Sequence, residues 1–323
     1  MTQALAAAAQ APGYPLTRGT PAVRDAVAAY LARRWHVSVD QGDVLPVIGT
    51  KELVAWLPTM LGVGPGAVVA YPELAYPTYE VGALLAGATP VRADPLESPA
   101  GLGSALRLLW LNSPSNPDGR VLPAEHLAAV VAWARARGVV VASDECYLEL
   151  GWDAEPVSIL HPDVCAGSHE GLLAVHSLSK RSNMAGYRAG FVVGDPTLVH
   201  ALHEVRRHAG MLVPGPVQAA MVAALGDQSH VDEQRRRYRR RRERLVTALT
   251  GAGFAIERSA GSLYLWATRG EAAMDSVMGL ARHGVLVAPG DFYGPAGSRH
   301  VRVSLTATDE RVESAATRLA ASR

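Results

Sequence analysis

Before Pro214, short apolar runs alternate with amphipathic segments of helical length, and Gly or Pro separates them. A continuous apolar run predicts a strand covered on both faces, and a helix between two such strands is the crossover that parallel pairing requires. The expected elements are strands over Asp43–Gly49, Ala67–Tyr71, Leu106–Leu111, Val139–Ala142 and Leu172–Val175, and helices over Lys51–Leu61, Thr78–Ala86 and Pro123–Arg137. Their order along the chain predicts an α/β fold with a mainly parallel central sheet and helices on both faces.

The pattern changes after Pro214. The elements expected there are helices over Pro216–Leu225, His230–Leu249, Ala272–His283 and Asp309–Ala320, with strands over Leu263–Ala267 and Val301–Leu305. We therefore predict a smaller C-terminal α+β domain. Its boundary is placed inside the long polar helix, giving a large domain over residues 14–240 and a small domain over 241–323.

Composition excludes several classes of protein. The 323 residues carry 31 Lys and Arg against 30 Asp and Glu, so we do not expect a nucleic-acid binder that relies on bulk charge. No apolar run approaches the roughly 18 to 20 residues that a membrane helix needs. Met1–Ala11 lacks the basic start of a signal peptide, and two cysteines are too few for a disulfide framework. The expected compartment is the cytoplasm, with no membrane partner.

One segment departs from this even charge balance. Arg235–Arg244 reads RRRYRRRRER, with eight arginines in ten residues. A patch for nucleic acid or phosphate is one interpretation. The other is a solvated helix face whose arginine stems cover apolar neighbours, and the balanced charge of the remaining chain favours it.

Lysine is rare in this chain. Only Lys51 and Lys180 occur, and all other Lys and Arg positions hold arginine. Arginine stays protonated, whereas a buried lysine can lose its proton and act as a nucleophile. Each lysine is therefore a candidate functional residue, although either could also be a chance survivor of a coding bias toward arginine.

Four motifs follow one another along the chain, and each alone is weak. They are NSPSNPDG at Asn112–Gly119, DECY at Asp144–Tyr147, SLSK at Ser177–Lys180 and GYRAG at Gly186–Gly190. Together they resemble the class I/II, fold-type-I aminotransferases that depend on pyridoxal 5′-phosphate (PLP). The resemblance runs from about Tyr14 to the C-terminus and implies a large PLP-binding domain, a small C-terminal domain and PLP as cofactor.

Elementary chemistry agrees with this resemblance at two positions. Lys180 follows an expected strand and is predicted to lie in a Ser- and Gly-rich loop. From there its amine can condense with the aldehyde of PLP, which both holds and activates the cofactor. The pyridine nitrogen must stay protonated, which calls for a buried carboxylate. Asp144 follows an expected strand at the sheet edge where such folds bind ligands, although a solvent-facing aspartate at a strand end is the plainer alternative.

The resemblance also implies contacts to the cofactor ring. Tyr147 and Asn116 match residues that hydrogen-bond its phenolic oxygen. Tyr76, in PELAYPTY, matches the aromatic residue that stacks on the pyridine ring, although an interior aromatic beside two prolines would look the same.

For the cofactor phosphate, the resemblance implies Arg188, Ser177 and Ser179, since arginine makes charge-assisted hydrogen bonds to phosphate oxygens. The turn at Gly49, Thr50 and Lys51 opens a helix, and helix N-termini bind anions. Tyr14, in GYPLTRG, matches the tyrosine that reaches the phosphate of a partner subunit. The implied assembly is a homodimer with shared active sites.

Arg302, in HVRVSL, matches the arginine that pairs with the substrate α-carboxylate. Asn116 and Tyr76 would contact the substrate as well. The eleven histidines show no metal-ligand spacing, so no metal site is expected. Cys146 lies between two motif residues, and we expect it to pack as a small apolar group.

Longer stretches resemble the succinyldiaminopimelate aminotransferases of lysine and diaminopimelate biosynthesis. They are VIGTKELVAWLP, PELAYPTYEVGALLAGA, YLELGWDAEP, VHSLSKRSNMAGYRAGF and LVAPGDFYGP. The implied reaction moves an amino group between N-succinyl-LL-2,6-diaminopimelate and 2-oxoglutarate. Both substrates carry a distal carboxylate, for which Lys51 is the candidate cation, although an arginine from elsewhere is equally allowed.

The sequence departs from this family at two places. Members usually carry a longer segment before the position of Tyr14, so residues 1–13 are expected to be a truncated N-terminal segment. Asp118 stands where the turn more often has threonine. Another amino-acid aminotransferase or a C–S lyase of the same fold, a truncated homologue of low activity, and a non-catalytic regulator with the same body remain alternatives.

Overall fold

The apolar runs form the strands of a sheet whose two faces are both buried. The computed structural model describes residues 1–94, 96 and 102–321. Within them, the larger sheet has seven strands, in the spatial order β1 (Val44–Ile48), β7 (Ala189–Gly194), β6 (Leu172–Ser177), β5 (Val140–Asp144), β4 (Leu106–Asn112), β2 (Val68–Tyr71) and β3 (Thr89–Arg92). β7 is antiparallel to both neighbours, and the other pairings are parallel. The mainly parallel sheet is confirmed.

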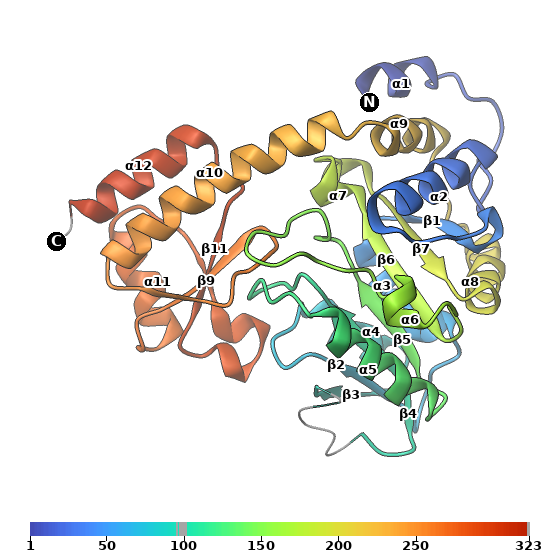
Figure 1. Cartoon of the computed structure of the whole chain (residues 1–323), viewed down its shortest axis with the longest axis horizontal. Coiled ribbons are helices and arrows are strands. Elements are labelled where there is room, and N and C mark those ends of the chain that lie inside the picture. Colours follow the sequence, from blue (N-terminus) through green and yellow to red (C-terminus); the bar gives the residue numbers. More distant parts are fainter. Residues whose placement is uncertain (95, 97–101, 322–323) are drawn as a thin grey trace.

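Helices cover both faces of this sheet, as Figure 1 shows. The helices of this part of the chain are α1 (Thr2–Ala7), α2 (Pro21–Trp35), α3 (Thr50–Met60), α4 (Thr78–Leu85), α5 (Ala124–Arg135), α6 (Pro162–Cys165), α7 (Leu178–Arg181), α8 (Pro196–Ala209) and α9 (Gly215–Gly226). Of these, α1 packs on α9 and not on the sheet. Successive strand residues point to opposite faces. Leu109 of β4 accordingly packs in one core with α2, α5 and α9, and Leu108 packs in the other with α3, α4 and α8.

A second sheet forms the core of the C-terminal unit. In the described residues its strands lie in the order β10 (Ala288–Pro289), β11 (Val301–Ser304), β9 (Tyr264–Thr268) and β8 (Ala255–Glu257), with antiparallel neighbours. Its helices are α10 (Ser229–Gly251), α11 (Ala273–Arg282) and α12 (Asp309–Ala320). We call this C-terminal part the small unit and the part built on the larger sheet the large unit. α10 runs unbroken from one to the other (Figure 1), so the boundary at residue 240 stays a prediction.

Most expected elements lie within a few residues of the observed ones, but several helices and strands were not predicted. β7 is the clearest case, since its first residues, Ala189 and Gly190, belong to the glycine-rich motif after Lys180. α2, α8 and β3 were also not predicted.

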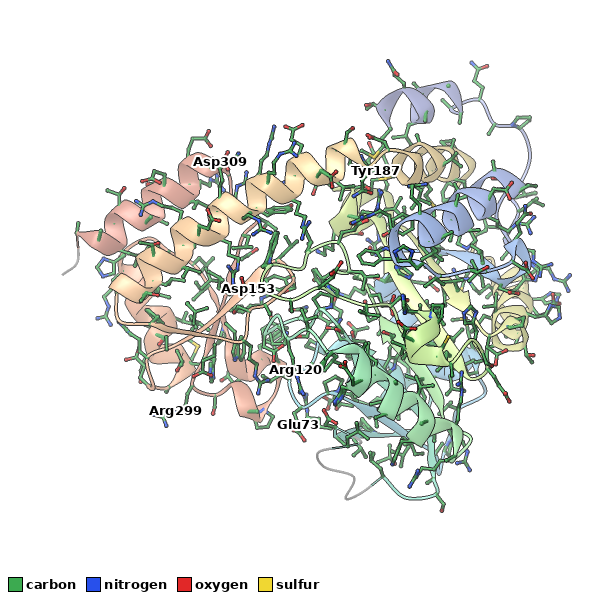
Figure 2. All side chains as sticks on the ribbon, viewed as in Figure 1. Glu73, Arg120, Asp153, Tyr187, Arg299 and Asp309 are labelled. Atoms are coloured by element: carbon green, nitrogen blue, oxygen red, sulfur yellow. The ribbon has the colours of Figure 1, made fainter. Side chains whose placement is uncertain are left out.

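The arginine-rich segment is part of α10, and several of its side chains are paired. Arg241 pairs with Asp309 of α12, and Arg244 pairs with Glu313. Arg242 pairs with Asp153 of the large unit. Figure 2 shows Asp309 and Asp153 close to this helix. These ion pairs favour the interpretation of a solvated helix face, because the arginines pair with carboxylates of the same chain. Among the described helices, none is both long and apolar enough to cross a bilayer.

Candidate active site

A cavity of about 450 Å³ lies where the carboxyl ends of β4, β5 and β6 meet the small unit. Most residues predicted from the sequence line it: Thr50, Lys51, Tyr76, Asn116, Asp144, Tyr147, Ser177, Ser179, Lys180, Arg188 and Arg302. Parallel strands bring their carboxyl ends to one edge of a sheet, which is how segments far apart in sequence come together here. Among the described residues, no group of His, Cys, Asp and Glu is arranged to hold a metal ion.

Asp144 ends β5 and is buried rather than solvent-facing. Its Oδ2 accepts a hydrogen bond from the hydroxyl of Tyr79 at 2.8 Å, and its Oδ1 accepts one from the backbone N–H of Cys146 at 3.1 Å. Burial raises the pKa of Asp144, whereas the hydrogen bonds from Cys146 and Tyr79 and the charge of Lys180 act in the opposite direction. A cation placed against this carboxylate would favour its ionised form further.

Asn112 ends β4 beside Asp144 and links two of the motifs. Its side-chain amide donates to the main-chain oxygen of Asp144 at 2.9 Å. Its side-chain oxygen accepts the backbone N–H of Asn116 at 2.8 Å. The turn that carries Asn116 is therefore fixed directly to the strand that carries Asp144.

Lys180 lies on the single-turn helix α7 and not in the loop expected from the sequence. The side chain of Ser177 caps this turn by accepting the backbone N–H of Ser179 at 3.1 Å. Such a cap satisfies a donor that the start of a helix leaves free. It explains why a Ser-rich segment after β6 becomes helical, and it holds Lys180 toward the cavity that Asp144 also lines.

Gly49 and Arg188 are in close contact, and Arg188 lines the cavity. Gly49 has a φ of 71°, and a Cβ atom at this position would collide with the guanidinium group of Arg188. Glycine is thus required both by the backbone and by the close approach of the arginine. Thr50 begins α3 directly after it, so hydroxyl, guanidinium and helix N-terminal N–H donors face a common region.

Arg302 reaches the cavity from β11 and is held by contacts from both units. Its Nη1 donates to Asn116 Oδ1 at 2.8 Å. Its guanidinium carbon lies 4.0 Å from the ring centre of Tyr264 and 4.9 Å from that of Tyr293. Its Nε is buried and has no hydrogen-bond partner in the described part of the chain. One buried donor is therefore left for an anionic ligand.

Tyr147 and Tyr264 join their hydroxyls at 3.1 Å across the border between the two units. Burial raises the pKa of Tyr147 well above its usual value, so the phenol keeps its proton and can donate a hydrogen bond. Tyr264 was not predicted, because nothing in its local sequence distinguishes it from any other strand tyrosine. Tyr79 was also missed, although it lies three residues after Tyr76 in the same stretch PELAYPTY.

Cys146 differs in part from the expectation of simple apolar packing. It packs against apolar residues, but it also lines the cavity, and its thiol donates to Thr50 Oγ1 at 3.2 Å. Burial raises the pKa of this thiol well above its usual value, and the neighbouring Asp144 adds to the shift. The raised pKa favours the neutral thiol over the nucleophilic thiolate.

Of the remaining predicted residues, Tyr76 and Lys51 line the cavity and Tyr14 does not. Tyr76 is half-buried and packs edge-on against Tyr79, with ring centres 6.3 Å apart. Lys51 is exposed, and its Nζ lies 5.8 Å from the ring centre of Tyr76. Tyr14 is 97% exposed and does not line the cavity of its own chain. Its predicted contact with a partner subunit remains a prediction.

The family model for class I and II aminotransferases matches residues 2–319. The chain belongs to this family. The PLP dependence expected from the sequence is therefore confirmed at the level of the family.

Relatives of known name agree on amino transfer. A probable aminotransferase of Mycobacterium tuberculosis is 63% identical over 98% of this chain and 76% of its own length. A 4-dedimethylamino-4-oxo-anhydrotetracycline transaminase of Streptomyces rimosus is 61% identical over 99% of this chain and 88% of its own. The structure of a probable N-succinyldiaminopimelate aminotransferase from Thermus thermophilus superposes with a TM-score of 0.90 at 28% identity, covering 100% of this chain and 90% of the other. This likeness confirms the fold-type-I architecture.

The residues around the cavity fit PLP. An amine and a buried carboxylate share one cavity at Lys180 and Asp144. The donors near Gly49 suit a phosphate, because the missing Cβ leaves the guanidinium of Arg188 free to approach. The protonated phenol of Tyr147 suits an anionic oxygen.

Proposed function

We propose that this aminotransferase moves an amino group between N-succinyl-LL-2,6-diaminopimelate and 2-oxoglutarate, in the cytoplasm. The products are the succinylated 2-amino-6-oxo acid and glutamate. One observation carries the amino-acid chemistry: the amine of Lys180 and the carboxylate of Asp144 share a cavity with Arg302, whose buried Nε has no partner in the described residues.

In this proposal Lys180 and Asp144 are the central catalytic residues. Bound PLP supplies an aldehyde for the substrate amine and a conjugated ring that takes up the electron pair of the broken Cα–H bond. Lys180 Nζ takes the α-proton as a general base. Asp144 holds a proton at the pyridine nitrogen through its buried carboxylate. Tyr147 is the third catalytic residue, and its hydroxyl would donate a hydrogen bond to the cofactor's phenolic oxygen, as would Asn116.

The cofactor is held at both ends. Arg188, Ser177, Ser179, Thr50 and the backbone at Gly49 and Lys51 bind the phosphate, and Tyr76 lies against the ring. These groups would hold the cofactor without help from Lys180, which leaves the amine of Lys180 free to act as a base. Their binding free energy therefore keeps PLP in place during turnover.

Substrate recognition depends on two cations. Arg302 forms a bidentate pair with the α-carboxylate, and Asn116 orients its guanidinium through the 2.8 Å hydrogen bond. Lys51, which is exposed and lines the cavity, binds the distal carboxylate. The proposal includes a homodimer in which Tyr14 of one subunit reaches the phosphate site of the other, since the phenol is exposed on its own chain.

A second candidate substrate is a polycyclic ketone of the tetracycline type. The observation in its favour is the 61% identity to the Streptomyces rimosus transaminase over 99% of this chain. Such a substrate has no distal carboxylate chain, so it would make little use of Lys51.

The test is a substrate panel with the PLP-loaded enzyme. Amino donors would include the succinylated diamino acid, alanine, glutamate and cystathionine, with 2-oxoglutarate or pyruvate as acceptor. We expect the succinylated donor with 2-oxoglutarate to give the highest kcat/KM. Faster turnover of a tetracycline ketone with an amino donor would favour the second candidate, and release of a thiol from cystathionine would favour a C–S lyase.

Two variants test the proposed cations. Arg302→Ala should raise KM for every carboxylate substrate by about a hundredfold or more, because breaking one side of a buried pair costs about 3 to 5 kcal/mol. Arg299→Ala, which changes an exposed arginine that is three residues earlier and does not line the cavity, is the matched control. Lys51→Gln should raise KM for the succinylated donor more than KM for alanine. Equal effects on both donors would place the distal carboxylate elsewhere.

A further inference from the structure

We propose that Asp118 and Arg258 form a positioning pair that sets the geometry of the carboxylate site at Arg302. The pair joins the large unit to the small unit: Arg258 Nη1 lies 2.6 Å from Asp118 Oδ2. Asp118 has a buried side chain, 4% exposed, whereas that of Arg258 is 51% exposed. The proposal rests on the proposed role of Arg302 in binding substrate carboxylates.

The turn that contains Asp118 is closely packed against residues 258–262 of the small unit. The backbone N–H of Ser259 donates to the oxygen of Asp118 at 2.8 Å, and that of Gly261 donates to the oxygen of Gly119 at 2.8 Å. A Cβ atom on Gly119 would lie 2.6 Å from the oxygen of Gly261. The two backbones are therefore in direct contact, and the ion pair of Asp118 with Arg258 joins the same two segments. Figure 2 shows Arg120, which follows this turn, at the border between the units.

A short route connects this junction to Arg302. The side chain of Ser259 accepts the backbone N–H of Trp266 at 2.9 Å, which fixes residues 258–262 to β9. Trp266 is the register partner of Arg302 in the pairing of β9 with β11. Arg302 in turn donates to Asn116, two residues before Asp118. The contacts thus form a closed ring in which one turn of the large unit holds the small unit at two points.

This ring explains why the pair acts on substrate binding. The hydrogen bond from Arg302 to Asn116 exists only while β11 keeps its place relative to the turn. Loss of the ion pair leaves Asp118 buried without its cation and loosens the backbone junction. Arg302 then loses part of its fixed orientation, which lowers its affinity for a carboxylate. Neither Asp118 nor Arg258 lines the cavity, so both are positioning residues.

The experiment compares Arg258→Gln, Arg258→Lys and Asp118→Asn in the PLP-loaded enzyme. All three keep a Cβ atom at their positions, and Asn retains an oxygen for the contacts that Asp118 makes with Ser115 and with the N–H of Arg120. Arg244→Gln is the matched control, because it removes an arginine–carboxylate pair that lies within the small unit. The readouts are KM for 2-oxoglutarate, kcat, the Kd for PLP, and the Kd for glutarate by calorimetry.

We expect Arg258→Gln and Asp118→Asn each to raise KM and the glutarate Kd three- to tenfold, with kcat and the PLP Kd within twofold of wild type. In Arg258→Lys, KM and the glutarate Kd should lie within twofold of the wild-type values. The double variant should be no worse than either single variant, since both remove the same interaction. Arg244→Gln should leave KM unchanged.

Two outcomes separate this proposal from the proposed function. If Arg302→Ala raises KM and glutarate Kd but Arg258→Gln and Asp118→Asn change neither, the positioning pair is wrong and the carboxylate site stands. If Arg302→Ala changes neither value, the carboxylate site itself is wrong. A drop in melting temperature without a change in KM or glutarate Kd would show a purely structural pair and overturn the proposal.

Discussion

The hydroxyl of Tyr79 donates a 2.8 Å hydrogen bond to Oδ2 of Asp144 inside the cavity. Both side chains are buried, and the ring of Tyr79 packs at 5.1 Å from that of Trp110. The phenol is therefore fixed by packing, and it fixes the carboxylate in turn. Burial alone would favour the neutral acid at Asp144, and the bond from Tyr79 counters this by stabilising the charged form.

Tyr79→Phe should lower kcat about tenfold while PLP stays bound. A hydrogen bond to a charged group contributes about 1.5 to 3 kcal/mol, of which part is recovered by rearrangement. The pKa of Asp144 should rise when the bond is lost, so the acid side of the pH–rate profile should move to higher pH. The measurement is kcat against pH for both enzymes.

Tyr71→Phe is the control for this variant, because Tyr71 is a buried tyrosine of β2 in the same sheet but does not line the cavity. Asp144→Asn should be more severe, since an amide cannot hold the pyridine nitrogen protonated. An unchanged kcat in Asp144→Asn would remove Asp144 from the mechanism.

A second buried carboxyl group belongs to Glu145, the residue that follows Asp144. Oε2 of Glu145 lies 3.3 Å from Nε2 of His176, and both side chains are at most 5% exposed. Burial raises the pKa of Glu145 to about 7 and lowers that of His176 to about 3. The folded state therefore favours a neutral acid beside a neutral imidazole.

These shifts give opposite pH dependences. Because the pKa of Glu145 is raised on folding, its contribution to stability is present below about pH 4.5 and is lost as pH rises toward 7. The pKa of His176 is lowered, so its contribution is lost as pH falls from 6.5 toward 3. Glu145→Gln mimics the neutral acid and should remove the first effect.

We expect Glu145→Gln to raise the free energy of unfolding at pH 8 by about 1 to 3 kcal/mol relative to wild type, with a smaller difference at pH 5. Urea unfolding at the two pH values measures this. Glu155→Gln, at an exposed glutamate, should behave like wild type at both. The free energy of unfolding could instead fall between pH 5 and pH 8 by the same amount in Glu145→Gln as in wild type. That result would contradict a raised pKa of Glu145 in the folded state.

The homodimer is tested by subunit mixing. Tyr14→Phe should loosen PLP roughly ten- to a hundredfold, because a hydrogen bond from the phenol to a phosphate is worth about 1.5 to 3 kcal/mol. The exposed ring leaves the fold of its own chain unaffected. Mixing Tyr14→Phe subunits with Lys180→Ala subunits should restore one tight site in each heterodimer. A fully active monomer would exclude shared sites.

Sequence alone could predict much of the sheet and most of the site, for a physical reason. Apolar runs such as Leu106–Leu111 are long enough to mark buried strands, and their carboxyl ends must meet at one edge. Asp144 and Asn116 follow such ends, and Lys180 follows another. The order of strands along the chain therefore predicts that Asp144, Asn116 and Lys180 converge.

The contacts that sequence could not predict cross between the two units. Tyr264 meets Tyr147, and Arg258 meets Asp118, across more than a hundred residues of chain. Nothing in the residues around Tyr264 or Arg258 marks them, because their roles come from how the small unit packs against the large one. β7 was missed for a local reason, since its glycine-rich start hid an apolar strand.

The central claim is that Lys180 carries the cofactor, and covalent trapping tests it most directly. Borohydride reduction of the PLP-loaded enzyme fixes a cofactor–lysine bond as a stable amine, which peptide mass spectrometry can locate. The chain offers a simple comparison, since Lys51 and Lys180 are its only lysines. We predict the label on Lys180 in wild type and in Lys51→Gln, and none in Lys180→Ala. A label on Lys51, or none on either lysine of the wild type, would contradict the account.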